Sequence, residues 1–242
     1  MDVHRPKAAH SIREFLIEIG TIVCGILIAL GLEQALQFFH HRAGEVEARA
    51  AIEGEMGRNI GYLRLRARKQ DACTAMRLGE LEARLHSYLV GGPWRPPGWV
   101  GRTTAWTMED TRWQAITKGG LAAMLSAREI ERYSYAQSRI GIIQTEENIE
   151  QADWAELRAM ESLPRLDLQL AARFEVVLRD TAYRVWRVSL LTKQLEAEAA
   201  RIGLPVLDTD RPQANTTCYP IDTTREEAVR MTKAAGYPYG EP

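Results

Sequence analysis

The chain has 242 residues, with 31 basic (Lys and Arg) and 32 acidic (Asp and Glu) side chains. This near balance excludes a global electrostatic attraction to nucleic acid or to an anionic surface. The three cysteines, Cys24, Cys73 and Cys218, are too few and too scattered for a zinc site or a disulfide-rich scaffold. Length and composition therefore predict one globular domain with an attached anchor.

An apolar segment near the N-terminus predicts a transmembrane helix over 15–39, preceded by a short cytoplasmic head over 1–14. The uncharged run over 19–32 covers only about 21 Å as a helix, less than the hydrocarbon core of a bilayer. Apolar flanks extend the helix to about 37 Å and leave Glu18 and Glu33 near its ends, where a carboxylate reaches water or headgroups. A cleaved signal peptide and the core helix of a soluble bundle stay open as alternatives.

One face of this predicted helix carries small residues between two carboxylates. At 100° per residue, Glu18, Thr21, Gly25, Ala29 and Glu33 fall on the same side. Small residues at intervals of four allow two helix backbones to approach closely in lipid, so this face predicts membrane helix packing. The alternative is that small residues are common in membrane spans and carry no such meaning.

Basic residues on the two sides of the predicted span set its expected orientation. Arg5, Lys7 and Arg13 precede the span, whereas Arg42 and Arg49 follow it closely. Because the cytoplasmic flank carries the excess of basic residues, the pattern favours a cytoplasmic N-terminus and a main domain outside the cytoplasm.

The same segment resembles a known signature. Glu18, followed by an apolar run into Gly25-Ile26-Leu27-Ile28-Ala29-Leu30, is similar to the N-terminus of bacterial single-span proteins grouped as domains of unknown function. The resemblance implies an anchored helical protein. Together with the orientation favoured by the basic residues, it leads us to expect the bacterial inner membrane, with the main domain in the periplasm. These families have no established activity, so the resemblance transfers no catalytic residue.

Helical periodicity predicts that residues 40–203 form a helical bundle. Apolar residues recur at helical spacing from about 45 to 89, as one helix or two, until Gly91-Gly92-Pro93 ends the pattern. A loop then continues to about residue 108. Residues 111–118 are predicted to form a short helix that two glycines stop.

The second half of the bundle is predicted to contain two long helices. Ser126 and Glu129 have the spacing of a capping box, which starts a helix that ends near Met160. The other helix extends from about Leu166 to Ile202 and has a continuous apolar stripe along one side.

Residues 204–242 are predicted to be an irregular tail with one short helix, capped by Thr223 and Glu226. No strand-like alternation appears along the chain. The sequence therefore predicts a mainly α fold, in which one N-terminal transmembrane helix is followed by an antiparallel helical bundle and an irregular C-terminal tail.

Cys73 and Cys218 are candidates for a disulfide. A main domain outside the cytoplasm places both thiols in an oxidising compartment, where neighbouring cysteines pair. Such a bond ties the tail to the first long helical segment. The alternative is that the two residues are unrelated small apolar side chains.

The loop after the first long segment is rich in tryptophan and proline. Trp94, Trp99 and Trp106 stand near Pro96 and Pro97. Aromatic side chains on a stiffened loop form a possible ligand or partner site, because they lose little entropy on binding. The alternative is a loop folded over the bundle with its rings as a plug.

Two charge clusters are interpreted as solvated helix faces. Neither accompanies a nucleic-acid motif or the Glu-x-x-His pattern of bundle metal sites. The basic cluster comprises Arg58, Arg64, Arg66, Arg68 and Lys69, and the acidic cluster comprises Glu146, Glu147, Glu150 and Asp153.

No catalytic or cofactor motif occurs in the sequence. G-x-S-x-G, the Walker loop, G-x-G-x-x-G, H-E-x-x-H and C-x-x-C-H are all missing, so no cofactor and no metal ligand is predicted. The leading hypothesis is a non-enzymatic, single-pass membrane protein whose partners are the lipid bilayer and either a second copy or another membrane protein. A ligand-sensing bundle outside the cytoplasm is the alternative, and an enzyme is the third choice.

Overall fold

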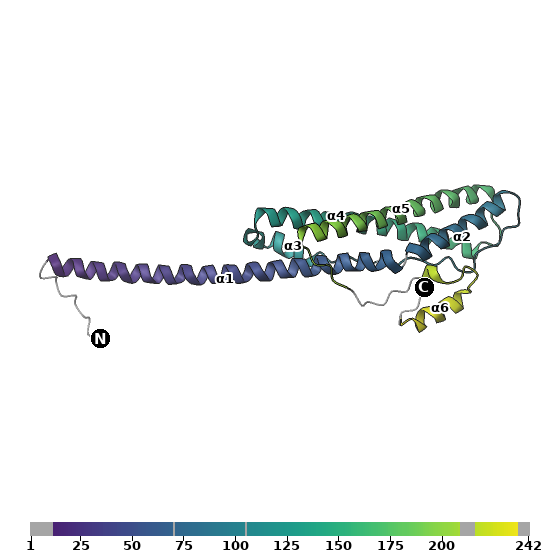
Figure 1. Ribbon diagram of the computed structural model, residues 1–242. Helices are drawn as coiled ribbons and strands as arrows, with labels where there is room; N and C mark the ends of the chain where they lie inside the picture. The colour runs from purple at the N-terminus through teal and green to yellow at the C-terminus, as the bar shows by residue number, and fades with distance from the viewer. Residues whose placement is uncertain (1–11, 70, 105, 209–215, 237–242) are drawn as a thin grey trace, which may run out of the picture. The chain divides into compact units, whose positions relative to one another are not determined.

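The computed structural model describes residues 12–69, 71–104, 106–208 and 216–236 (Figure 1). In these residues the chain forms α-helices, short 3-10 helices and no strand, which confirms the mainly α fold. The chain divides into two units, Met1–Arg49 and Ala50–Pro242. Most of the predicted cytoplasmic head lies outside the described residues.

The first unit consists of the N-terminal part of α1 (Ile12–Lys69). All side chains over 12–43 are exposed, including Leu27 at 62% and Ile28 at 63%. This part of α1 is long and apolar enough to cross a membrane, and its most apolar stretch buries none of its residues within the chain. Its composition thus requires an apolar surrounding that the described chain does not itself provide.

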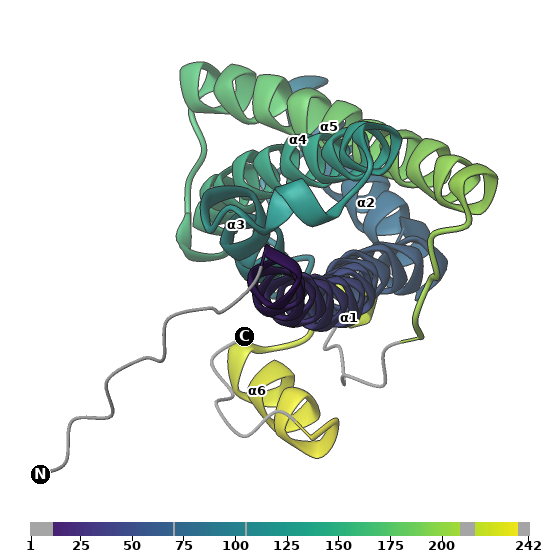
Figure 2. The ribbon, with the colours of Figure 1, turned by 90° about the vertical axis from the view of Figure 1, so that its left-hand side faces the viewer.

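The second unit is built on the C-terminal part of α1, α2 (Asp71–Leu89), α4 (Ala127–Leu157) and α5 (Leu168–Ile202). Helices α4 and α5 pack along their length and run in opposite directions, and α5 also packs on α2 (Figures 1 and 2). The remaining helices are α3 (Thr111–Lys118) and α6 (Arg225–Ala234), with 3-10 helices at Leu121–Met124, Arg158–Ser162 and Thr216–Cys218.

The core of this unit follows the periodicity of the sequence. Ile52, Met56 and Ile60 on α1 are fully buried, since steps of four keep them on one side of the helix. Near the other end of the bundle, a second apolar cluster surrounds Trp154 and Phe174. Each large buried side chain of this kind stabilises the fold by about 1.5 to 3 kcal/mol relative to exposure.

An irregular segment over 90–104 and 106–110 connects α2 to α3. It returns along α1 and α2, where Asn59 Nδ2 donates to the carbonyl of Glu109 at 2.7 Å. It also follows α4, where Thr103 Oγ1 donates to Glu150 at 2.8 Å and the Val100 amide donates to Glu161 at 2.7 Å. The amide of Asn59 and the carboxylate of Glu161 thereby satisfy backbone groups that lack a helix or sheet partner.

Helix ends agree with the local chemistry of the sequence, with two corrections. The Ser126 and Glu129 capping box is present, as predicted. Helix α5 begins at Leu168, two residues later than predicted, because Asp167 accepts from the Leu170 amide at 2.8 Å. Its end at Gly203 has φ +71°, a left-handed conformation that favours glycine.

The predicted cap of the last helix is wrong by one residue. Thr224, and not Thr223, accepts from the amide at the third helical position, Glu227, at 3.3 Å. Both threonines precede a glutamate by three residues, so the sequence pattern fits either register. Thr223 is instead buried in the turn that holds the tail on the bundle.

Candidate functional site

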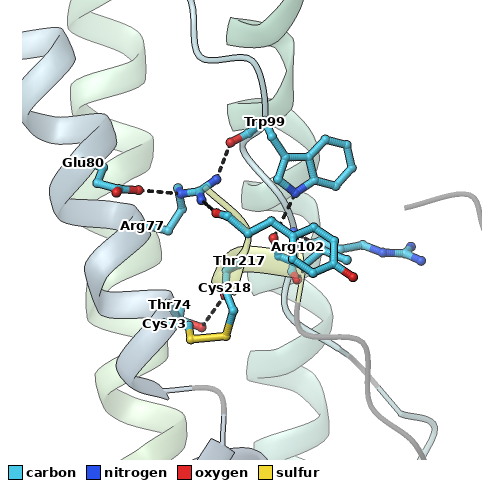
Figure 3. The surroundings of a disulfide bond; sticks show 10 residues. Cys73, Thr74, Arg77, Glu80, Trp99, Arg102, Thr217 and Cys218 are labelled. Atoms are coloured by element: carbon cyan, nitrogen blue, oxygen red, sulfur yellow. Dashed lines mark hydrogen bonds and ion pairs between the residues drawn. A yellow bond between two sulfur atoms is a disulfide. The ribbon is translucent and has the colours of Figure 1, made fainter. Parts of the chain in front are cut away.

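Cys73 at the start of α2 and Cys218 in the tail are joined by a disulfide (Figure 3). The S–S distance is 2.03 Å, the Cα atoms lie 4.9 Å apart, and 145 positions separate the two residues in sequence. The pair considered from the sequence is therefore brought together. Next to it, the hydroxyls of Thr74 and Thr217 lie 3.4 Å apart. The bond fixes the tail on the bundle and limits the freedom of the unfolded chain.

One turn after Cys73, Arg77 joins three separate segments with one buried guanidinium (Figure 3). It donates to the carbonyl of Trp99, to that of Val100 at 3.1 Å and to that of Tyr219, while its Nε donates to Glu80 at 2.9 Å. Burial lowers the pKa of Arg77, and the hydrogen bond with Glu80 opposes this shift. The rigid fork of a guanidinium suits such multiple acceptors.

Sequence analysis did not single out Arg77, although the sequence contains a signal. Thr74, Arg77, Leu81 and Leu85 are spaced by three or four residues, so the arginine stands on the apolar stripe of α2. A charge on such a stripe has to find partners in the interior. The disulfide, Arg77 and Trp99 together form a tail clamp, a name kept for these four residues below.

The three tryptophans of the predicted binding loop are anchors of that loop on the bundle. Trp99 is 2% exposed, and its indole donates to the carbonyl of Thr216 at 2.9 Å. The Trp94 indole donates to the carbonyl of Leu163 at 2.8 Å, and the ring of Trp106 lies 5.1 Å from that of Tyr62. A ligand or partner cannot reach the Trp99 ring, so that hypothesis is wrong for this residue. Trp94 and Trp106 are half-buried, and their role stays a prediction.

One residue of the basic cluster and two of the acidic cluster meet in the interior, which corrects the interpretation as solvated faces for these three, whereas Arg58 and Arg68 are exposed as expected. Arg66 is 2% exposed, and its guanidinium donates to Glu147 at 2.5 Å and also to Glu150. Both glutamates are fully buried. The carboxylate of Glu150 accepts further hydrogen bonds from Thr103 and from the indole of Trp154. These three charged side chains are therefore part of the core.

The buried cluster has one cation for two carboxyl groups, so their charges do not balance. Burial alone lowers the pKa of Arg66, but the charges of Glu150 and Glu147 outweigh burial and raise it above the ordinary value. Burial raises the pKa of Glu147 to about 7, against the opposing charge of Arg66. Arg66 thus stays charged, and Glu147 takes up a proton near neutral pH.

Other members of the two clusters also pair across the bundle. Arg64 donates to Glu196 at 2.6 Å, and Arg58 donates to Glu109 at 3.0 Å. Arg184 lies between Glu146, at 3.4 Å, and Asp153. These pairs are partly exposed, and such pairs stabilise a fold by about 0 to 1 kcal/mol.

The predicted membrane packing face is uncovered in the single chain. Glu18, Thr21, Gly25, Ala29 and Glu33 are all exposed. The Thr21 hydroxyl donates to the carbonyl one turn earlier at 2.8 Å, and Glu33 accepts from Gln37 at 3.3 Å. A Cβ atom at Gly25 meets no atom within 4 Å. The backbone on this face is open to a neighbouring helix.

A groove of about 490 Å³ lies between α2 and α5. Leucine side chains and the small residues Gly79 and Ala83 make its apolar part, and His86, Glu175 and Arg179 add polar groups. None of the tryptophans lines it. Among the described residues, no group of three or more His, Cys, Asp or Glu side chains is arranged to hold a metal ion.

Comparisons with protein families, with curated proteins and with solved structures found no match for this chain.

Proposed function

We propose that the protein is a non-enzymatic, single-pass membrane protein that acts through contacts with a second copy of itself or with another membrane protein. The observation that carries the proposal is the N-terminal part of α1, a long helix whose apolar side chains are exposed over 12–43. Burying such a helix in lipid removes this apolar surface from water and leaves no backbone group unpaired.

The proposed address is the bacterial inner membrane, with a cytoplasmic N-terminus and the bundle in the periplasm. The disulfide between Cys73 and Cys218 supports this side of the membrane, because disulfides persist in the periplasm and are rare in the cytosol. The excess of basic residues before the span supports the same orientation.

Membrane anchoring and topology are tested first. The full chain is expected in the membrane pellet after alkaline carbonate extraction. When fused at Pro242, a reporter that is active only in the periplasm is expected to give a signal, and a reporter that is active only in the cytoplasm is expected to give none. Recovery of the full chain in the soluble fraction without detergent overturns the anchor. A cytoplasmic signal from the reporter overturns the orientation.

Helix pairing is tested by crosslinking in native membranes. Gly25→Ile places a branched side chain on the packing face and is expected to reduce the crosslinked dimer several-fold. Gly20→Ile is the matched control, because position 20 falls on the opposite side of the helix and also has open space around its Cβ. Equal loss in both variants, or no crosslinked species at all, contradicts pairing through this face.

The alternative of a ligand-sensing bundle has one supporting observation, the groove between α2 and α5. Its volume of about 490 Å³ lies in the range of small-molecule sites. The tryptophan loop, which suggested sensing from the sequence, packs elsewhere. The anchored interaction protein is therefore the function that the geometry supports best.

A further inference from the structure

A polar cleft of about 550 Å³ lies between the first turns of α4 and the last turn of α5. Arg128, Arg132 and Tyr135 line it from α4, where steps of four and three residues keep side chains on one face of the helix. Glu198 and Arg201 line it from α5, one turn apart. Three arginines therefore meet at the junction of two helices.

Arg132 carries a buried donor that the chain leaves unpaired. Its side chain is half-buried, and its Nε atom is buried without a hydrogen-bond partner among the described residues. Buried donors without a partner are rare in folded proteins, where water or an ion otherwise satisfies them. This donor belongs to a cation, so an anion satisfies it better than water does.

The charges that line the cleft do not balance. Nε and one Nη atom of Arg201 donate to the two carboxylate oxygens of Glu198, at 2.8 and 2.5 Å. The pKa of Glu198 is lowered, first by the hydrogen bond from Arg201 and then by the charges of Arg201 and Arg132. With that pair neutral, Arg128 and Arg132 remain against one further carboxylate, that of Glu131. One positive charge is in excess.

The hydroxyl of Tyr135 adds a neutral donor to the cleft. It accepts from Nε of Arg139 at 3.1 Å, so its own proton is available to another acceptor. The guanidinium of Arg139 also lies 5.2 Å from the ring centre, which holds the ring in place. Donors thus come from three successive turns of α4. A phosphate has oxygens for all of them, whereas a carboxylate has only two.

We infer that this cleft binds a phosphate group, held by charge-assisted hydrogen bonds from Arg128 and Arg132 and by the hydroxyl of Tyr135. The phosphate belongs to a free phosphate compound or to the headgroup of a lipid, since the same donors recognise both. The inference goes beyond the proposed function and depends neither on the anchor nor on self-association.

Calorimetric titration of the full chain in an uncharged detergent tests the site, with inorganic phosphate as the probe at neutral pH and low ionic strength. Arg132→Gln is expected to weaken saturable binding at least about fivefold. Arg179→Gln is the matched control, because it removes the same charge from an exposed position of α5 outside the cleft. Equal losses in the two variants indicate a general electrostatic effect and overturn the inference.

A substitution that strengthens binding separates the site from mere damage to the fold. Glu131→Gln removes the unpaired carboxylate from the cleft and is expected to tighten phosphate binding several-fold. Unchanged or weaker binding overturns the placement of the anion in this cleft. The unfolding curve of Arg132→Gln without phosphate should match that of the unmodified chain, because the arginine has no hydrogen bond there to lose.

Two further probes identify the anion and its source. Acetate is expected to bind at least about fivefold more weakly than phosphate, and equal affinity overturns the assignment to phosphate. Native mass spectrometry with added phosphatidylglycerol counts bound lipid. Lipid that Arg132→Gln loses and Arg179→Gln retains assigns the phosphate to a headgroup, and binding of inorganic phosphate without such lipid assigns it to a free compound. If neither phosphate nor lipid binds, the inference is overturned, while the anchor and the self-association stand on their own tests.

Discussion

The two parts of α1 show opposite relations between composition and burial. Over 12–43, apolar side chains such as Ile26 and Leu30 point outward and are at least half exposed. Over 50–69, Ile52, Met56 and Ile60 are fully buried, and a charged residue, Arg66, is buried further along the same helix. One continuous helix thus presents an exposed apolar surface in one unit and a buried apolar stripe with one charged residue in the other.

The difference teaches that a helix adapts to its surroundings through the arrangement of its side chains and not through its backbone. A helix that is apolar on all sides needs an apolar surrounding, and lipid provides one without further protein. A helix with one apolar stripe needs protein on that stripe, and a charge placed there requires a partner from another helix. Substitutions in the buried part should therefore lower the stability of the bundle, whereas substitutions in the exposed part should impair membrane insertion.

The largest effect is expected from Arg66→Met in the buried part of α1. Removing the guanidinium leaves Glu147 and Glu150 buried without a cation, which should destabilise the bundle by about 3 to 5 kcal/mol. Arg68→Met is the matched control, since Arg68 is exposed two residues later and its loss should change stability by less than about 0.5 kcal/mol. Chemical denaturation in detergent, followed by circular dichroism, measures both.

A compensating variant sharpens this prediction. Adding Glu147→Gln and Glu150→Gln to Arg66→Met removes the uncompensated charges and should restore at least half of the lost stability. If the single variant is no less stable than Arg68→Met, the cluster does not hold the bundle together.

The next effect is expected from opening the tail clamp. Replacing Cys73 and Cys218 with serine releases a closure over 145 residues and should cost about 2 to 5 kcal/mol in unfolding free energy. Arg77 still holds Trp99 and Tyr219, so the tail should remain docked at neutral pH without denaturant. Hydrogen exchange measures docking separately from stability. Loss of protection in the tail of the folded variant contradicts the role given to Arg77.

In the exposed part of α1, a charged substitution is expected to impair insertion of the helix into the membrane. Leu27→Arg puts a cation near the centre of the proposed span, which should cost about 2.5 to 3.5 kcal/mol of insertion free energy. Phe39→Arg, at the end of the span, should cost far less because the side chain reaches the headgroups. Carbonate extraction should release the first variant and retain the second. Neither substitution should alter the unfolding free energy of the bundle. A changed unfolding free energy contradicts the independence of the two parts of α1.

The sequence was sufficient for features that rest on local chemistry. The Ser126 capping box and the end of α5 at Gly203 each depend on residues within one helical turn, so a short pattern specifies them. The apolar character of the N-terminal part of α1 is likewise a property of composition alone.

The buried charges were not predicted, because their partners lie far apart in sequence. Arg66 is 81 residues from Glu147, and no local rule relates them. A signal was nevertheless present in the stripes. Arg66 follows Leu63 by three residues on the buried side of α1, and Glu147 follows Ile143 by four on that of α4. A positive charge on one apolar stripe and a negative charge on the other indicate that the two side chains pair in the core.

The smallest effect that we predict is a dependence of bundle stability on pH through Glu147. The pKa of this carboxyl group is raised to about 7 in the folded chain, above its ordinary value of 4.5 in the unfolded chain. The folded state therefore favours the protonated form. This contribution is fully present below pH 4.5 and is lost as the pH rises through 7, so stability should fall by about 2 kcal/mol between pH 5 and 8.

Glu147→Gln isolates that contribution, because an amide cannot lose a proton and keeps a similar shape. The variant should lose most of the decrease between pH 5 and 8 that the unmodified chain shows. Burial also raises the pKa of Asp71 and of Glu161, so a smaller slope of the same sign should remain. Denaturation midpoints at the two pH values measure both slopes. An identical slope in the two chains indicates that Glu147 is ionised over the whole range from pH 5 to 8. In that case Arg66 stabilises both carboxylates in their charged form, although it is a single cation facing two of them.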